Sequence, residues 1–383
     1  MSELSRQQAV DDLHILDTPP EVRFDRITRL ARQLFGVETA AITLIDHDRQ
    51  WFKSKIGSDL IEGARSDAFC DFTIRKSEVF NVSDATKDPR FARNPLVLGE
   101  PNIRFYAGYP LEAPSGEHVG ALCVFDPHPR DFSESEKDLL KDLALWVQKE
   151  MIIEAEVGRA IEVQRGLLPK QRVELHGYES AGGCASARAV GGDFYDWYDV
   201  DEGEAFTLVD VMGKGIGAAI IAATVRAVLR AGSKTGDLVS AVEVAANTLE
   251  SDLDNVGSFA TLFHARLDIA TGRVRYIDAG HGLSLLLGAN GSTTRLTSEN
   301  PPLGIGIGGK WEVQYFNLTP GDTLVSVSDG VLDLFDGTLA SLENIEKIVR
   351  QAKSAQGAVD ALLDLVGNSA LDDVTILIVH RNE

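Results

Sequence analysis

Four aspartates lie at the ends of apolar segments in the second half of the sequence, where a charge is costly unless something neutralises it. Asp193 follows two glycines, Asp210 ends the apolar segment AFTLV, Asp329 follows TLVSVS, and Asp372 opens the segment DDVTILIV. A single aspartate in such a place is usually a turn or cap residue. Because the ends of neighbouring strands in one sheet lie about 5 Å apart, we expect these four carboxylates to converge.

Converged carboxylates repel one another and are driven to protonate unless a cation lies between them. The ligand set contains only oxygen, with no histidine or cysteine beside these aspartates, which favours Mg²⁺ or Mn²⁺ over zinc. Two such ions about 3.5 to 4 Å apart can hold a water, lower its pKa and aim it at a phosphorus atom. The pattern therefore predicts two-metal hydrolysis of a phosphate ester.

The segment GKGIGAA, residues 213–219, directly follows the Asp210 strand. Its glycines let the chain turn sharply from this strand into a helix. The same letters fit the dinucleotide fingerprint G-x-G-x-x-G/A. Asp210 would oppose a pyrophosphate there, and no parallel βαβ series follows, so we disfavour a nucleotide-binding oxidoreductase.

The elements that must position these residues fall into two groups. In the N-terminal part we expect a helix that starts at Thr18 and its following prolines and ends at Gly36, then strand pairs at 40–57 and 103–126. After Pro169 the pattern changes to strands with turns at 270–272, 280–282 and 290–291, and helices are expected at 217–231 and near 341–366. Antiparallel strands with helices in both parts indicate an α+β protein.

A long helix is predicted between the two parts, over residues 133–168. Ser133 and Glu136 have capping-box spacing, and Glu150 and Gln164 interrupt a 3-4 repeat of Leu139, Leu143, Trp146, Ile153, Val157, Ala160 and Leu167. Such a helix is about 50 Å long at 1.5 Å per residue. It could pack against its own domain. We favour a parallel coiled coil between two protomers, since the repeat runs past the reach of one domain.

Residues 10–145 resemble a GAF domain of the bacterial signalling type. The resemblance is carried by LDTPPE, DRQWFKS, AFC at 68–70, DPRFARNPLV, IRFYAGYPL and GALCVFD. Many such domains have a histidine two positions after the cysteine, where this chain has Phe72, and no Cys-His pair suited to tetrapyrrole attachment is seen. The GAF ligand is therefore left unassigned.

Residues 165–380 resemble the metal-dependent serine/threonine phosphatases of the PPM type, in their SpoIIE-like bacterial branch. The motifs occur in the family's order: LLP at 167–169, RAVGGDFYD at 188–196, VDVMGKGIGAA at 209–219, DAGHG at 278–282, PPLGIG at 301–306, VSDGV at 327–331 and DDVT at 372–375. The resemblance implies a C-terminal α/β/β/α sandwich and two divalent cations, Mn²⁺ or Mg²⁺.

The resemblance also implies roles for individual residues. Asp210 would bridge the two metals with help from the Val211 carbonyl, Asp329 and Asp372 would complete one metal's shell, and Asp193 would bind the other metal. Arg188 matches the phosphate-binding arginine, although a surface ion pair is the alternative. Asp373 is expected to contact the metal ligands rather than a metal. His281 of DAGHG is expected to have a packing role.

Two positions depart from the family pattern. Met212 stands where relatives have a histidine or serine, so the proton for the leaving group would come from water or from the substrate's surroundings. Asp333 stands where many bacterial relatives have glutamate.

The sequence therefore predicts three parts: a GAF sensor domain at residues 1–132, a linker helix at 133–169 and a SpoIIE-like phosphatase domain at 170–383. By resemblance, the substrate would be a phosphorylated STAS-type anti-anti-sigma factor. Rotation of the linker helix would shift the glycine turn after Asp210 and so control metal occupancy. A catalytically inactive scaffold that binds a partner protein is the alternative.

Composition limits the partners. The formal charge of −21 disfavours nucleic acid and anionic membrane surfaces. The sequence has no unbroken apolar run of about 18 residues and no signal-peptide core, which indicates a cytoplasmic protein. Cys70, Cys123 and Cys184 are scattered and are expected to be buried small hydrophobes rather than disulfide or zinc residues.

Overall fold

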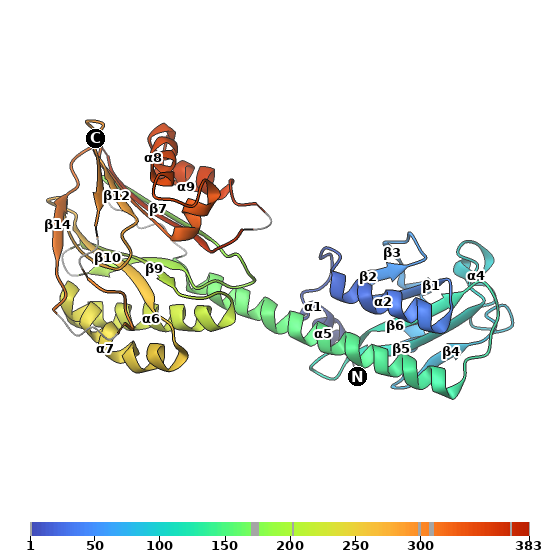
Figure 1. Cartoon of the computed structure of the whole chain (residues 1–383). Helices are drawn as coiled ribbons and strands as arrows, with labels where there is room; N and C mark the ends of the chain where they lie inside the picture. The colour runs from blue at the N-terminus through green and yellow to red at the C-terminus, as the bar shows by residue number, and fades with distance from the viewer. Residues whose placement is uncertain are drawn as a thin grey trace. The chain divides into compact units, whose positions relative to one another are not determined.

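The structure is a computed structural model that describes residues 2–169, 176–200, 203–297, 300–305, 310–367 and 370–382, without the side chains of residues 234 and 235. The chain divides into two compact units, Met1–Arg159 and Ala160–Glu383. Both units combine antiparallel sheets with helices, so the expected α+β class is confirmed. Figure 1 shows the elements of each unit.

The first unit is built on a six-stranded antiparallel sheet with the order β3-β2-β1-β6-β5-β4. Both expected strand pairs form, β1 with β2 and β5 with β6. The strands are β1 Thr39–Ile45, β2 Arg49–Ile56, β3 Glu62–Ala64, β4 Phe80–Val82, β5 Phe105–Glu112 and β6 His118–Asp126.

Helices cover both faces of this sheet. The helices α1 (Glu3–Asp11), α2 (Val22–Phe35) and the first part of α5 share one core with it. The short helix α3 (Phe69–Thr73) packs in a second core on the other face, near α4 (Pro95–Leu98). Helix α2 ends at Gly36 as expected, with a left-handed φ of 60°, but it begins at Val22 rather than at the prolines.

Helix α5, Glu134–Leu167, begins with the expected capping box, in which the Ser133 backbone N–H donates to Glu136 and the Glu136 N–H donates to the Ser133 hydroxyl. Its buried face differs from the expected repeat. Leu140, Leu143, Ala144, Val147, Met151 and Ala155 are buried in the core of the first unit.

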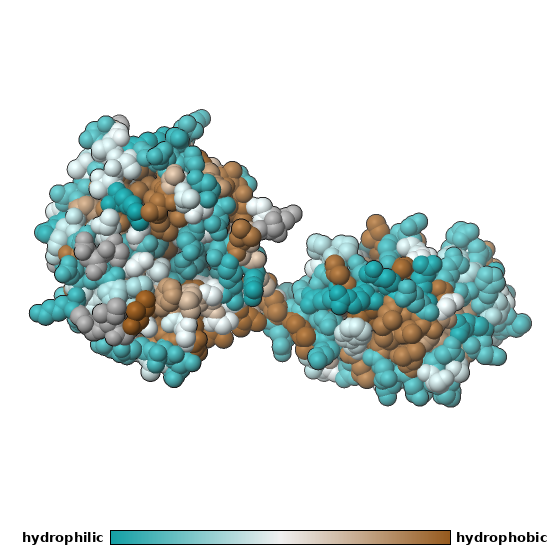
Figure 2. Space-filling model, viewed as in Figure 1, coloured by the Kyte–Doolittle hydropathy of each residue, from teal (hydrophilic) through white to brown (hydrophobic). Residues whose placement is uncertain are grey.

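Within the expected repeat only Leu143 is buried, while Trp146 and Ile153 are exposed. Figure 2 shows hydrophobic atoms along the visible face of this helix. The helix therefore packs on its own domain with one face and keeps a second apolar stripe in solvent. The polar residue Glu150, which interrupts the repeat, accepts a hydrogen bond from the Trp146 indole at 3.1 Å.

The second unit contains two five-stranded antiparallel sheets, with the orders β14-β11-β10-β9-β8 and β13-β12-β15-β16-β7. An apolar core lies between them, formed by residues such as Phe206, Phe263 and Leu377. The strands are β7 Tyr178–Ala185, β8 Phe194–Val200, β9 Gly203–Val211, β10 Ala260–Asp268, β11 Arg273–Ala279, β12 Ser284–Leu287, β13 Thr293–Leu296, β14 Gln314–Asn317, β15 Thr323–Val327 and β16 Val374–Arg381.

Two helices cover the outer face of each sheet (Figure 1). Helices α6 (Ile216–Thr235) and α7 (Leu238–Val256) pack on the sheet that contains β9, and α8 (Ser341–Gln351) and α9 (Ala355–Leu363) pack on the sheet that contains β16. The arrangement is the expected α/β/β/α sandwich. Helix α7 is not among the elements expected from the sequence.

Helix α6 is the single helix in the described part of the chain with the length and composition to cross a membrane, over Ile216–Ser233. A third of this window is buried, and its contacts are those of a helix packed with one face on a sheet. Its apolar residues pack on β9 and α7, and Arg226 and Arg230 pair with the buried carboxylate of Asp196 at 3.1 and 2.5 Å. A pair of charged arginines fixed to a buried acid is typical of a helix packed inside a folded domain.

Candidate metal centre

The four aspartates come from both sheets of the second unit. Asp193 directly precedes β8 and Asp210 is the last residue but one of β9, so these two belong to neighbouring strands of one sheet. Asp329 opens a short 3₁₀ helix after β15, and Asp372 lies two residues before β16, in the other sheet. The expectation of a single sheet edge is therefore wrong. Each sheet contributes two of the four carboxylates.

The carboxylates lie close enough to change one another's pKa. Burial and the neighbouring Asp329 raise the pKa of Asp210 to about 7. Burial and the charge of Asp210 raise the pKa of Asp193 well above its usual range. Burial and Asp372 raise the pKa of Asp329. Without a cation, this cluster binds protons in place of metal.

The donor atoms fit a hard divalent cation. Asp193 is 4% exposed, and its Oδ2 atom is buried without a hydrogen-bond partner in the described part of the chain. Such an orphaned carboxylate oxygen, beside other carboxylates and the Val211 carbonyl, is a suitable ligand for Mg²⁺ or Mn²⁺.

The carboxylates are gathered but are not in the final geometry of a metal site. Among the residues that the structure describes, no group of three or more His, Cys, Asp or Glu side chains is arranged so that it could hold a metal ion. Asp372 is paired with Lys214, whose ammonium group lies 2.9 Å from Asp372 Oδ2 and also donates to the Leu371 carbonyl. A cation bound by Asp372 would compete with this ion pair.

The loop between β7 and β8 carries Asp193 and is held by Asp373. One carboxylate oxygen of Asp373 accepts the backbone N–H of Ala187 at 2.7 Å, and the other accepts that of Gly192 at 2.7 Å. A Cβ atom on Gly191 would lie 2.6 Å from Asp373 Oδ2, and one on Gly192 would lie 2.8 Å from the Val211 carbonyl oxygen. The two glycines of the GGD motif are thus needed for close backbone approach.

The same loop is held from the other side by Gln164 near the end of α5. The Gln164 side chain donates to the Gly191 carbonyl at 2.6 Å and accepts from the Gly191 N–H at 3.1 Å. Sequence reasoning missed this role, although Gln164 was visible as a polar residue at an apolar position of the repeat. Sequence reasoning also missed Lys214, although a lysine between two glycines beside the acidic cluster could have indicated it.

The other residues expected at the site differ in position. Arg188 is exposed and makes no ion pair with another described residue, and a Cβ atom on Gly215 would lie 3.5 Å from its Cδ. Its side chain therefore passes over the glycine turn that follows Asp210. Met212 is 43% exposed beside this turn. Asp333 is exposed and lies near Asp329, whose pKa it helps to raise.

His281 is buried away from solvent and hydrogen-bonds the Ser326 hydroxyl at 3.1 Å. Burial lowers its pKa to about 3, so it stays neutral. These are the contacts of a packing residue. Gly306 of the PPLGIG motif lies outside the described residues.

Comparison with known proteins matches each unit to a family. Residues 19–151 match the GAF domain family, and residues 201–382 match the SpoIIE family, described as Stage II sporulation protein E. A cyclic di-GMP phosphodiesterase of Pseudomonas aeruginosa is 47% identical over 128 residues, which are 33% of this chain and 22% of that protein. Phosphoserine phosphatase RsbU of Bacillus subtilis is 25% identical over 238 residues, which are 60% of this chain and 71% of RsbU.

The solved SiaA-PP2C domain of Pseudomonas aeruginosa has the same fold. It aligns with a TM-score of 0.52 and 20% sequence identity, over 62% of this chain and 99% of that domain. The fold of the second unit is therefore that of a PP2C-type domain. Residues 19–151 belong to the GAF family and residues 201–382 to the SpoIIE family of phosphatase domains.

Proposed function

We propose that this protein is a metal-dependent protein serine/threonine phosphatase whose activity is controlled by its GAF domain. The observation that carries the proposal is the position of Asp193, Asp210, Asp329 and Asp372 at the ends of strands from both sheets, with Asp193 Oδ2 buried and without a hydrogen-bond partner among the described residues. A phosphatase relative, RsbU, is 25% identical over 238 residues.

In the proposed site, Asp193, Asp210, Asp329, Asp372 and the Val211 carbonyl hold two divalent cations, Mn²⁺ or Mg²⁺. When bound, such cations lower the pKa of a water and stabilise the charge that develops on a phosphoryl group. Arg188 binds the phosphate, which its exposed position over the glycine turn permits. Asp373 and Gln164 position the loop that carries Arg188 and Asp193.

The proposed substrate is a phosphoserine or phosphothreonine on a small regulator of the STAS type, in the cytoplasm. The exposed positions of Asp329 and Arg188 support a protein substrate, since a residue on a large partner can reach them from solvent. We further propose a homodimer through α5. The exposed Trp146 and Ile153 on that helix support this, since one apolar stripe remains after the other face is buried.

Control by the GAF domain would pass through α5, which begins in the first unit and ends in the second. Its contact with the catalytic domain is made to Gly191, in the loop before Asp193. We therefore place the switch at this loop, rather than at the glycine turn after Asp210 that the sequence suggested. Inserting residues after Gly158, beyond the last buried position of the helix at Ala155, tests this route.

Each inserted residue rotates the downstream helix by about 100°. Insertion of one residue should change activity strongly, and insertion of seven should restore it in large part. Equal activity for insertions of one, three, four and seven residues would exclude control through helix rotation.

The first experiment is hydrolysis of a phosphoserine peptide by the full chain with graded Mn²⁺ or Mg²⁺. Wild type should need metal, and Asp210→Asn should lose nearly all activity. Asp252→Asn removes the same charge at an exposed position on α7 and should behave as wild type. Activity that survives EDTA or the Asp210→Asn change would contradict the proposal.

A catalytically inactive scaffold is the second candidate. Calorimetry with Mn²⁺ separates the two, because a scaffold has no need of the carboxylate cluster. A protein that neither binds Mn²⁺ nor hydrolyses a phosphopeptide, as the full chain or in the insertion variants, would favour the scaffold.

A further inference from the structure

Two cysteines of the GAF domain meet inside it. Cys70 on α3 and Cys123 on β6 are each 1% exposed, and their sulfur atoms lie 3.6 Å apart. Both line a cavity of about 90 Å³ in the first unit, together with apolar residues such as Phe69, Ile103 and Phe125. A small neutral molecule that enters this cavity reaches both sulfurs.

The two sulfurs have different surroundings. The Tyr106 hydroxyl donates to Cys70 Sγ at 3.2 Å, and the Gln50 side-chain amide lies 3.6 Å from the same atom. Tyr106 is in turn 2.7 Å from the Thr73 hydroxyl, which fixes its orientation. Burial alone would raise the pKa of Cys70, but hydrogen bonds, above all from Cys123, lower it overall.

The pKa of Cys123 moves in the opposite direction. Its hydrogen bond with Cys70 and its burial raise the pKa well above the usual thiol range. The pKa values of the two thiols are therefore shifted in opposite directions, and the thiolate is the nucleophilic form of a cysteine.

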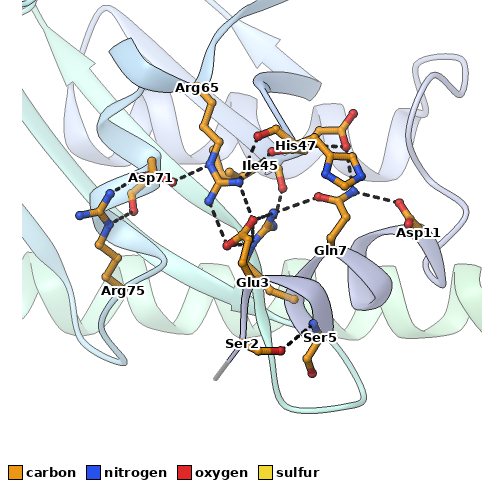
Figure 3. A network of polar contacts seen from close by, with 12 residues as sticks. Ser2, Glu3, Ser5, Gln7, Asp11, Ile45, His47, Arg65, Asp71 and Arg75 are labelled. Carbon is orange, nitrogen blue, oxygen red and sulfur yellow. Dashed lines mark hydrogen bonds and ion pairs between the residues drawn. The ribbon is translucent and has the colours of Figure 1, made fainter.

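The backbone that carries Cys70 is held in place by an ion-pair network (Figure 3). Asp71, the next residue, accepts from Arg65 Nε at 2.8 Å and pairs with Arg75. Arg65 also pairs with Glu3 of helix α1 at 2.6 Å. Closing the sulfur–sulfur distance to a bond of about 2.05 Å therefore depends on side-chain rotation at the two cysteines, not on movement of α3.

We propose that Cys70 and Cys123 are a redox-active dithiol, which a small hydroperoxide entering the cavity oxidises to an intramolecular disulfide. The Cys70 thiolate attacks one peroxide oxygen, the O–O bond breaks, and the released hydroxide takes up a proton as water, leaving a sulfenic acid on Cys70. The Cys123 sulfur then attacks that sulfenic sulfur, and its proton leaves with the hydroxyl group as a second water. Two thiols are oxidised and one peroxide is reduced.

Cys184 of the second unit serves as an internal comparison. Thr375 donates to its sulfur at 3.2 Å, and burial followed by the charge of Asp193 raises its pKa to about 12. Neither of the other two cysteines lies in the same unit. It should therefore remain reduced when Cys70 and Cys123 react.

The test uses the full chain, reduced and then treated with graded hydrogen peroxide. The peroxide is removed, and the protein is unfolded in denaturant that contains N-ethylmaleimide, which alkylates the remaining free thiols. The intact mass is then measured. We expect one N-ethylmaleimide adduct in place of three, so that the mass is lower than that of the reduced and alkylated protein by two adducts and two hydrogens, and a peptide that joins Cys70 to Cys123. A dithiol reductant should restore all three thiols.

Three variants complete the experiment. Cys184→Ser should still lose two thiols, whereas Cys70→Ser and Cys123→Ser should not form an intramolecular disulfide. Cys123→Ser should instead accumulate oxygen adducts on Cys70. Wild type that keeps all three thiols, or that gains oxygen on Cys70 as readily as Cys123→Ser does, would overturn the proposal. Because wild type alone gives a decisive result, the conclusion does not depend on the folding of any variant.

Discussion

The side-chain amide of Gln164 hydrogen-bonds both backbone groups of Gly191, at 2.6 Å to the carbonyl and 3.1 Å from the N–H. Because Gly191 lies two residues before Asp193, the last turns of the linker helix help to determine where a proposed metal ligand stands. Asp373 holds the neighbouring Gly192 at 2.7 Å. The loop is therefore held by two side chains, Gln164 of the linker helix and Asp373, the residue directly before β16.

Gln164→Ala should lower kcat/KM for a phosphopeptide by about 5- to 30-fold, since losing paired hydrogen bonds to a buried loop costs about 1 to 2 kcal/mol. The Mn²⁺ concentration for half-maximal activity should rise as well. Arg165→Ala, an exposed neighbour on the same helix, is the control and should match wild type. Steady-state kinetics with graded Mn²⁺ provides both quantities, and a Gln164→Ala enzyme with wild-type metal dependence would show that the contact does not position Asp193.

Asp373→Ala should weaken Mn²⁺ binding by about 10- to 100-fold, the usual effect of removing a group that orients metal ligands. The change leaves the backbone N–H groups of Ala187 and Gly192 without their acceptor. Asp373→Asn retains one acceptor oxygen and should fall between alanine and wild type. Calorimetric titration measures the affinities, and thermal unfolding of the metal-free variants separates lost affinity from lost folding.

Lys214→Gln should tighten Mn²⁺ binding by up to about fivefold, since a partly exposed ion pair is worth about 0.2 to 1 kcal/mol. The lysine competes with the cation for Asp372, which lies 2.9 Å from its ammonium group. Lys347→Gln on the exposed face of α8 makes the same charge change away from the site. Weaker binding in Lys214→Gln, with Lys347→Gln unchanged, would mean that the lysine instead holds Asp372 in its binding position.

Glu204→Gln should stabilise the protein at alkaline pH. Burial and, to a smaller extent, the cross-strand neighbour Asp199 raise the pKa of Glu204 to about 8. The carboxylate oxygens of Glu204 have no hydrogen-bond partner among the described residues. The native state therefore holds a proton that the unfolded state releases, so stability is full below the ordinary glutamate pKa and falls as pH rises toward 8.

At pH 9 the glutamine variant should be more stable than wild type by about 1 to 3 kcal/mol, the cost of an uncompensated buried polar group. At pH 5 the two should be nearly equal. Glu250→Gln, exposed on α7, should show no such divergence. Thermal unfolding across this pH range checks the prediction, and parallel curves for wild type and Glu204→Gln would contradict it.

Features fixed by neighbouring residues could be predicted from the sequence. The capping box at Ser133, the end of α2 at Gly36 and the hairpin of β5 and β6 depend on local turn and cap chemistry. Helix α7 was missed although its buried residues Leu238, Val242, Ala245 and Leu249 follow helical spacing.

Features that depend on sheet membership and tertiary contact could not be predicted in this way. The aspartates were recognised individually, but their division between two sheets is set by pairings distant in sequence, such as β15 with β16. Helix α5 carries two apolar stripes, and periodicity alone does not say which one the domain buries. The meeting of Cys70 and Cys123 likewise joins residues 53 positions apart.

If the proposed site binds metal, the division of its carboxylates between two sheets links metal binding to the stability of the sandwich. In the proposed site, Asp193 before β8, Asp210 in β9, Asp329 after β15 and Asp372 before β16 would supply ligands from both sheets, so that a bound cation would stabilise the contact between the layers. It adds RT ln(1 + [metal]/Kd) to the free energy of unfolding of this unit. A core substitution between the sheets, at Phe206 or Leu377 for example, would then weaken metal affinity without touching a ligand.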